Sequence, residues 1–226
     1  MTSLVLACLL FLVSHLVVSP SPLRPWLIGR MGQGAYLGLY SVVSLVALVW
    51  MGYAYGQAPF VPVWQPPPGM AHMALILVPL AFVLLVLSVA TPNPTAGPTG
   101  KALTEGRATG IIAVTRHPMM WAFTLWAVAH LLANGDLASI LLFGTVLVVA
   151  QAGMVLLDRR KAREAPEGFA RLAAATSRLP FVALAQGRVR TSLREIGLVR
   201  ILIGLGLAAA MLAAHPWLFG VSPLPG

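Results

Sequence analysis

The sequence predicts an all-α integral membrane protein, a six-helix transmembrane bundle with both termini on the outer, periplasmic side. The first observation is composition: of 226 residues, 58% are hydrophobic and 9% are charged, and the mean hydropathy is +0.86. Soluble domains carry about 25% charged residues, so an ordinary soluble domain and a disordered chain are both excluded. The second observation is six apolar segments, each near the roughly 20 residues that a membrane-crossing helix needs. The third is the placement of the basic residues between them.

The first three apolar segments occupy residues 3–19, 36–55 and 70–90, the last with Pro79 inside it. Segment one stops at a Ser-Pro-Ser-Pro run, because proline interrupts a helix. No Lys or Arg precedes this segment and no small-residue cleavage site closes it, so we expect a retained helix rather than a signal peptide. Its Cys8 is the only cysteine, which excludes an intramolecular disulfide and cysteine-based zinc or iron–sulfur sites.

The last three apolar segments occupy residues 118–132, 137–157 and 198–218. The fourth has an alternative start at Ile111, and the fifth follows Asn134-Gly135-Asp136, a turn signal. The loop 91–110 is rich in Pro, Gly and Thr and is expected to be irregular. Residues 158–196 are expected to form a cytoplasmic amphipathic segment with a short helix at about 166–176, lying on anionic headgroups or in water. Residues 1–226 then make one transmembrane domain.

The basic residues occupy alternate loops. Arg24 and Arg30 lie between segments one and two, and Lys101, Arg107 and Arg116 lie between segments three and four. The remaining ten lie between segments five and six or at the start of six: Arg159, Arg160, Lys161, Arg163, Arg171, Arg178, Arg188, Arg190, Arg194 and Arg200. Cytoplasmic loops carry the excess of Lys and Arg, so this pattern places both termini outside. The net charge of +9 therefore indicates a lipid bilayer as partner, and no nucleic acid.

Five histidines lie within or at the ends of the apolar segments: His15, His72, His117, His130 and His215. Ionisable groups in membrane helices are costly and usually mark functional sites, and histidine is a common axial ligand of haem. Carboxylates are nearly absent from the segments, which disfavours a di-iron or zinc-hydrolase site. These imidazoles predict a haem b site; the alternative is that each is a hydrogen-bonded core or helix-end histidine.

One histidine has a different setting. His117 lies in Thr115-Arg116-His117-Pro118 at the inner end of segment four, where proline fits the first turn of a helix. Arg116 and His117 predict either a cofactor phosphate held at a helix N-terminus or a helix cap that also marks the cytoplasmic side.

The chain resembles the NnrU family of bacterial membrane proteins over nearly its full length. The resemblance rests on Phe11-Leu12-Val13-Ser14-His15, Gly38-Leu39-Tyr40-Ser41, His72, Thr115-Arg116-His117-Pro118, Ala129-His130-Leu131-Leu132-Ala133-Asn134-Gly135-Asp136, Leu142-Phe143-Gly144, Ala175-Thr176-Ser177-Arg178-Leu179-Pro180-Phe181 and His215-Pro216-Trp217-Leu218-Phe219-Gly220-Val221. It implies a multi-pass protein of the bacterial inner membrane that is associated with nitrite and nitric oxide reduction, with nitrite or nitric oxide reductase components as partners.

The NnrU family is in turn similar to the haem b enzyme zeta-carotene isomerase. That similarity implies His15 and His130 as haem ligands and, as an alternative activity, haem-dependent cis–trans isomerisation of an apolar, carotenoid-like polyene substrate. The predicted topology separates these two histidines in depth by about 13–15 Å, at about 1.5 Å rise per residue. His72, at the depth of His130, is therefore the next candidate ligand.

A more distant resemblance is to membrane methyltransferases that bind S-adenosylmethionine. It rests on Arg116-His117-Pro118 followed by Glu164, Glu167 and Phe169. Here Met119-Met120-Trp121-Ala122 replaces the aromatic residue and glycine of that pattern, and Ala165-Pro166 separates the acids. This resemblance implies S-adenosylmethionine as an alternative cofactor at Arg116 and Glu164. A third alternative is a non-catalytic accessory subunit, whose sixth segment offers small residues for close helix contact: Gly204, Gly206, Ala208, Ala209 and Ala210.

Overall fold

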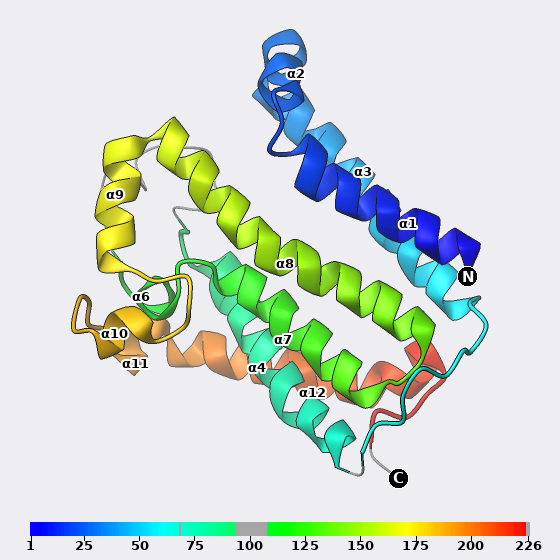
Figure 1. Ribbon diagram of the computed structural model, residues 1–226. Helices are drawn as coiled ribbons and strands as arrows, with labels where there is room; N and C mark the ends of the chain where they lie inside the picture. Colours follow the sequence, from blue (N-terminus) through cyan, green and yellow to red (C-terminus); the bar gives the residue numbers. More distant parts are fainter. Residues whose placement is uncertain (68, 94–107, 225–226) are drawn as a thin grey trace.

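Figure 1 shows the computed structural model, which describes the chain except residues 68, 94–107 and 225–226. The described part consists of helices and connecting loops without β-strands, and it has one isolated antiparallel bridge between Pro62 and Asp136. Each predicted apolar segment corresponds to helix: α1 (Thr2–Leu12) with the π-helix η1 (Val13–Val18), α3 (Gln33–Gly56), α4 (Met70–Ala90), α7 (Pro118–Ala133), α8 (Leu137–Glu164) and α12 (Leu198–Phe219). The all-α prediction is therefore confirmed.

Four helices of the described chain, α3, α4, α8 and α12, are long and apolar enough to cross a membrane. A fifth candidate is the pair formed by Thr2–Val18 and α2 (Leu23–Met31), which is bent by 85° at the Ser-Pro run. Helix α7 is apolar but shorter, with 16 residues. These four or five helices make the chain a membrane protein by length and composition.

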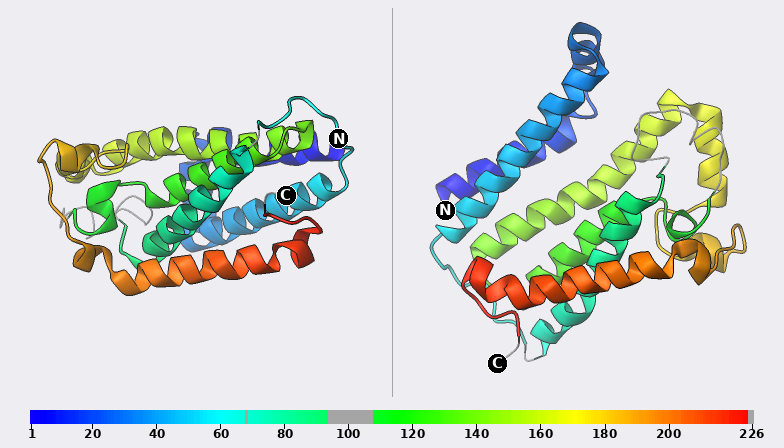
Figure 2. Two further views of the ribbon diagram at one scale, coloured as in Figure 1. Left: turned by 90° about the horizontal axis from the view of Figure 1, so that it is seen from below. Right: turned by 180° about the vertical axis from the view of Figure 1, so that it is seen from behind.

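The helices pack in an order that differs from their order in the sequence. Helix α4 lies between α7 and α12, α7 lies against α8, and α8 in turn contacts α1, η1 and α3. Figures 1 and 2 show α1 and α3 side by side, apart from the α4–α7–α12 group, with α8 between the two groups. The C-terminus of α8 lies near the buried Arg116 and His117, and we call this the basic end of the bundle.

The loop after α3 is attached to the turn between α7 and α8. The amides of Val63 and Trp64 donate to the carbonyl oxygen of Gly135 at 2.8 and 3.0 Å, and Leu137 donates to Val61 at 2.9 Å. A Cβ atom on Gly135 would collide with the Trp64 carbonyl oxygen, so only glycine allows this approach. The predicted Asn-Gly-Asp turn is thus a docking point for a distant loop.

Two boundaries differ from the sequence prediction. The alternative start of segment four at Ile111 is wrong, because Ile111–Val114 forms a separate short helix, α6, and Thr115 is extended with φ −154° and ψ 140°. Helix α8 continues beyond residue 157 to Glu164, since Arg, Lys, Ala and Glu are good helix formers and basic residues favour a helix C-terminus.

The rest of the basic end consists of short helices. The helix expected at about 166–176 is present as α9 (Pro166–Ala175), followed by α10 (Val182–Ala185) and α11 (Leu193–Ile196). Most of the loop 91–110 that was expected to be irregular, with Lys101 and Arg107, lies outside the described residues.

Candidate functional site

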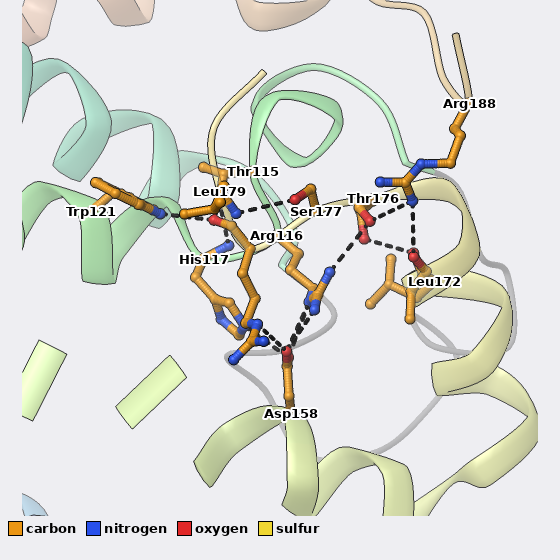
Figure 3. Close-up of polar contacts among 12 residues, drawn as sticks. Thr115, Arg116, His117, Trp121, Asp158, Leu172, Thr176, Ser177, Leu179 and Arg188 are labelled. Carbon is orange, nitrogen blue, oxygen red and sulfur yellow. Dashed lines mark hydrogen bonds and ion pairs between the residues drawn. The ribbon is translucent and has the colours of Figure 1, made fainter. Parts of the chain in front are cut away.

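A buried carboxylate joins the two residues of the Arg-His-Pro turn. Asp158 on α8 accepts hydrogen bonds from Arg116 Nε at 3.0 and 3.1 Å and from a terminal guanidinium nitrogen at 2.6 Å. His117 Nε2 lies 2.8 Å from Asp158 Oδ1, the oxygen that the terminal nitrogen of Arg116 does not contact. Figure 3 shows Arg116 and His117 converging on Asp158 from the segment before α7. Arg116 is 8% exposed and His117 is 2% exposed, so this is a closed, charged network.

A third chain segment covers the network. The Arg116 amide donates to the Ser177 carbonyl at 3.0 Å, Thr115 Oγ1 donates to the Arg178 carbonyl at 2.8 Å, and the Phe181 amide donates to the Val114 carbonyl at 2.9 Å. A strap of residues 176–181 therefore runs beside residues 114–116, as Figure 3 shows. The extended conformation of Thr115 between α6 and α7 exposes these backbone groups for pairing.

Side chains attach the strap to the charges. Arg116 donates to the Thr176 carbonyl at 3.3 Å, Arg188 donates to the same oxygen at 2.9 Å, and Arg178 Nε lies 3.5 Å from Asp158. The Trp121 indole donates to the Arg178 carbonyl at 2.8 Å. The network therefore holds the segment before α7, the C-terminal part of α8 and the strap after α9 together.

Burial lowers the pKa of His117 below its ordinary value, and the hydrogen bond from its Nε2–H to Asp158 offsets part of this effect. The ionised Asp158 balances the Arg116 charge, as buried arginines require. The guanidinium also lies over the Phe169 ring at 5.9 Å. This geometry favours a role for Arg116 and His117 in holding the basic end together over capture of a cofactor phosphate at the turn.

The sequence reasoning missed Asp158, and it used residues 175–181 for the family resemblance without foreseeing their contact with residues 114–116. A signal for Asp158 was available, because the chain has only six acidic residues and this one follows an apolar segment directly. A lone carboxylate at that position needs a cationic partner when it is buried. The partner itself could not be identified, because His117 lies 41 residues away in the sequence.

The five histidines fall in different places, and His15 and His130 lie in separate side-chain clusters. The His15 ring in η1 stacks on Phe11 at 4.1 Å between ring centroids and lies 5.4 Å from Tyr40. The His130 ring in α7 lies 4.5 Å from Phe143 and 4.8 Å from Trp126. The exposed His72 opens α4, and His215 Nδ1 lies 3.0 Å from the Val221 carbonyl.

His15 and His130 share one hydrogen-bond arrangement. Nδ1 of each ring lies beside the carbonyl oxygen four residues earlier, 2.8 Å from Phe11 and 2.7 Å from Trp126. A carbonyl can only accept, so Nδ1 carries the proton and Nε2 of the neutral ring keeps its lone pair. A backbone partner of this kind orients histidines that ligate metals. Within the described residues, no group of three or more His, Cys, Asp or Glu side chains could hold a metal ion.

Glu164, the acid in the methyltransferase resemblance, takes part in an ion-pair cluster. Its carboxylate lies 3.2 Å from Arg24 on α2, 3.8 Å from Arg160 and 3.6 Å from Lys161 on α8. Glu164 therefore connects α2 to the end of α8, a contact that sequence spacing did not indicate.

Comparison of the sequence with known proteins identifies a family but no individual similar protein. No curated protein and no solved structure matches the chain. A family model described as "NnrU protein" matches residues 3–223, nearly the whole length. The matched region contains the histidines, the Arg-His-Pro turn, Asp158 and the strap. The chain therefore belongs to the NnrU family.

Proposed function

We propose that this NnrU-family protein is a six-span protein of the bacterial inner membrane that binds haem b through membrane histidines and serves nitrite or nitric oxide reduction. The observation that carries the proposal is the orientation of His15 and His130. Each ring is held by its Nδ1–H on a backbone carbonyl, at 2.8 and 2.7 Å, and keeps the Nε2 lone pair that an axial ligand needs.

The ligand set of the chain fits haem better than a bare metal ion. A metal held by protein alone needs three or four ligands from side chains, and no such group occurs in the described parts of the chain. The porphyrin supplies four nitrogens itself, so one or two histidines complete its iron. The rings of Trp126 and Phe143 around His130 offer the apolar contact that a porphyrin favours. Bound haem would supply one-electron redox chemistry.

Six spans with both termini outside follow from adding two shorter segments to the four long helices. The α1–η1 helix and α7 are the additions, and every Lys and Arg then lies on one side. The positive-inside rule supports this arrangement, and it supports the cytoplasmic side for the basic end.

The test is an absorption spectrum of the detergent-purified protein, oxidised and then reduced with dithionite, with quantitation of extracted haem. A stoichiometric Soret band is expected, and His130→Ala is expected to abolish it while the protein stays folded. His72→Ala tests the next candidate ligand, and because this histidine is exposed, its spectrum should match the parent. A changed Soret band in His15→Ala would show that the His15 imidazole also ligates the haem iron. A colourless parent protein after expression with added haem contradicts the proposal.

Two alternative activities can be tested separately. If the protein is a haem-dependent isomerase, the reduced protein should convert a cis-polyene to its trans isomer, and His130→Ala should lose this activity. Methyl transfer requires S-adenosylmethionine binding that depends on Arg116 and Glu164. The contacts of Arg116 with Asp158 and of Glu164 with Arg24 favour structural roles for both, so calorimetry should give no heat with that cofactor.

A further inference from the structure

A second polar cluster at the basic end has hydrogen-bond donors without acceptors. Within the described chain, Tyr36 Oη, Ser44 Oγ and Arg160 Nε are buried and make no hydrogen bond. Tyr36 as a whole is only 4% exposed. Leaving a buried polar group without a partner is unfavourable, so these groups indicate a ligand that completes them. We call these three residues the Tyr36 cluster.

The fold brings the cluster together from two helices. Tyr36, Tyr40 and Ser44 are four residues apart on α3, so they lie one above another on one helix face. The Tyr36 and Tyr40 rings stack at 6.1 Å, and the Tyr40 hydroxyl lies near Ser44. Arg160 reaches this face from α8 and lies within electrostatic range of both tyrosines.

The cluster carries an excess of positive charge. Arg24 lies over the Tyr36 ring at 5.7 Å, beside Arg160. These two arginines share one carboxylate, Glu164, at 3.2 and 3.8 Å. The Arg160 Nε–H can only donate, and the two hydroxyls can donate as well. The complementary group is therefore an anion with several acceptor oxygens, as in a phosphate.

The surroundings of the cluster favour an amphiphile over a free ion. On α3, exposed apolar side chains lie within one turn of Tyr36, with Leu37 41% and Leu39 50% exposed, and Val13 (45%) and Val17 (59%) are exposed on η1. Acyl chains can lie against these faces while the head group enters between the helices. Basic sites between helices on the cytoplasmic side bind anionic lipid head groups by this combination.

We propose that Tyr36, Ser44 and Arg160, with Arg24 at the edge, bind the phosphate of an anionic phospholipid. The proposal is independent of haem. It explains why the Tyr36 hydroxyl is buried without a hydrogen-bond partner beside two arginines that share one carboxylate, Glu164. It also assigns a role to the bend between η1 and α2, which brings Arg24 over the Tyr36 ring.

The test is native mass spectrometry of the full-length protein in detergent with equal amounts of phosphatidylglycerol and phosphatidylcholine. The parent protein is expected to retain one phosphatidylglycerol preferentially. Arg160→Gln should lower its occupancy about tenfold, equivalent to about 1.4 kcal/mol of binding free energy. Arg163→Gln is the matched control, because it removes one charge from an exposed position on the same helix, and it should retain the lipid.

Tyr36→Phe provides a second test that keeps the charge. Without lipid this variant should melt at or above the parent temperature, because it removes an unpaired buried hydroxyl. With phosphatidylglycerol it should lose most of the parent's rise in melting temperature. Equal lipid retention and equal melting shifts in parent, Arg160→Gln and Tyr36→Phe would overturn the proposal. Displacement of the lipid by millimolar inorganic phosphate would identify a free oxyanion as the ligand and overturn the lipid assignment.

Discussion

Asp158 is the residue on which the burial of Arg116 and His117 depends. Its two oxygens accept from both side chains and also lie near Arg178. A buried guanidinium without a carboxylate carries the cost of desolvation without compensation. The network therefore acts through its charge balance as much as through its hydrogen bonds.

Replacing Asp158 with Asn should lower the free energy of unfolding by about 3–5 kcal/mol, because Arg116 is left as an uncompensated buried charge. The measurement is chemical or thermal unfolding of the purified protein in detergent. Glu167→Gln, at an exposed position of α9, is the control and should change stability by less than about 0.5 kcal/mol. Similar losses in both variants would contradict the assigned role of Asp158.

Stability should also depend on pH through His117. Its pKa in the folded protein is lowered by burial, whereas in the unfolded chain it is about 6.5. The unfolded state therefore binds a proton first as the pH falls, so this contribution to stability is present above pH of about 6.5 and is lost below it. The melting temperature should fall less between pH 7.5 and 5.5 in His117→Gln than in the parent. An equal fall in the two proteins would contradict this role of His117.

The sequence could identify Arg116 and His117 but not their partner. The two residues stand in a recognisable turn before a helix, a local pattern. Asp158 is joined to them only by tertiary packing of α8 against α7, and the strap at 176–181 by backbone hydrogen bonds to residues 114–116. Neither long-range pairing leaves a periodic signal in the chain.

At the scale of helices, the long apolar segments were predictable and the geometry of the irregular joints was not. Residues 70–90 were predicted as a helix with Pro79 inside, and α4 has those bounds. The break after segment one was predictable from its Ser-Pro-Ser-Pro run, whereas the π-helical turn Val13–Val18 and the 85° angle before α2 were not. Hydrophobicity is equally high in an α-helix and a π-helix, so composition cannot separate them.

The contact between α4 and α12 should depend on one glycine. A Cβ atom on Gly204 would lie 2.6 Å from the Val83 Cα, whereas a Cβ on Gly206 would meet nothing within 4 Å. We expect Gly204→Ala to lower the free energy of unfolding by about 1–3 kcal/mol through overpacking. Gly206→Ala, two residues along the same helix, should leave stability unchanged or slightly raised, because alanine favours helix. Equal unfolding curves would show that α12 does not pack as described.

At the scale of the whole molecule, the distribution of charge makes a prediction about orientation. In a Cys8→Ser background, Phe60→Cys, in the loop after α3, should react with a membrane-impermeant maleimide on intact spheroplasts. Arg190→Cys, at the basic end, should react only after lysis. Both positions are exposed, so a difference reports sidedness rather than burial. Labelling of Arg190→Cys first would invert the topology that the positive-inside rule gives.

The sequence yields a definite topology prediction, which the labelling experiment tests, because charge placement is a property of the whole chain and survives errors of several residues at each boundary. The order of packing was not predictable, since α12 lies beside α4 and α8 lies beside α1, and apolar faces carry little information about their neighbours. Membrane helices associate through shape and small residues, as at Gly204. Many helix orders therefore satisfy the same hydropathy pattern.

The attachment of the loop after α3 to Gly135 has a consequence for how the chain tolerates length changes. The hydrogen bonds of Val61, Val63 and Trp64 divide one long connection between α3 and α4 into two short ones. Each short piece loses less conformational freedom when its ends are fixed than a single long piece would. Inserted residues should therefore be accommodated readily between Gln57 and Phe60, where the chain leaves α3. The same insertion between Val61 and Val63 would shift Val63 and Trp64 out of register with Gly135.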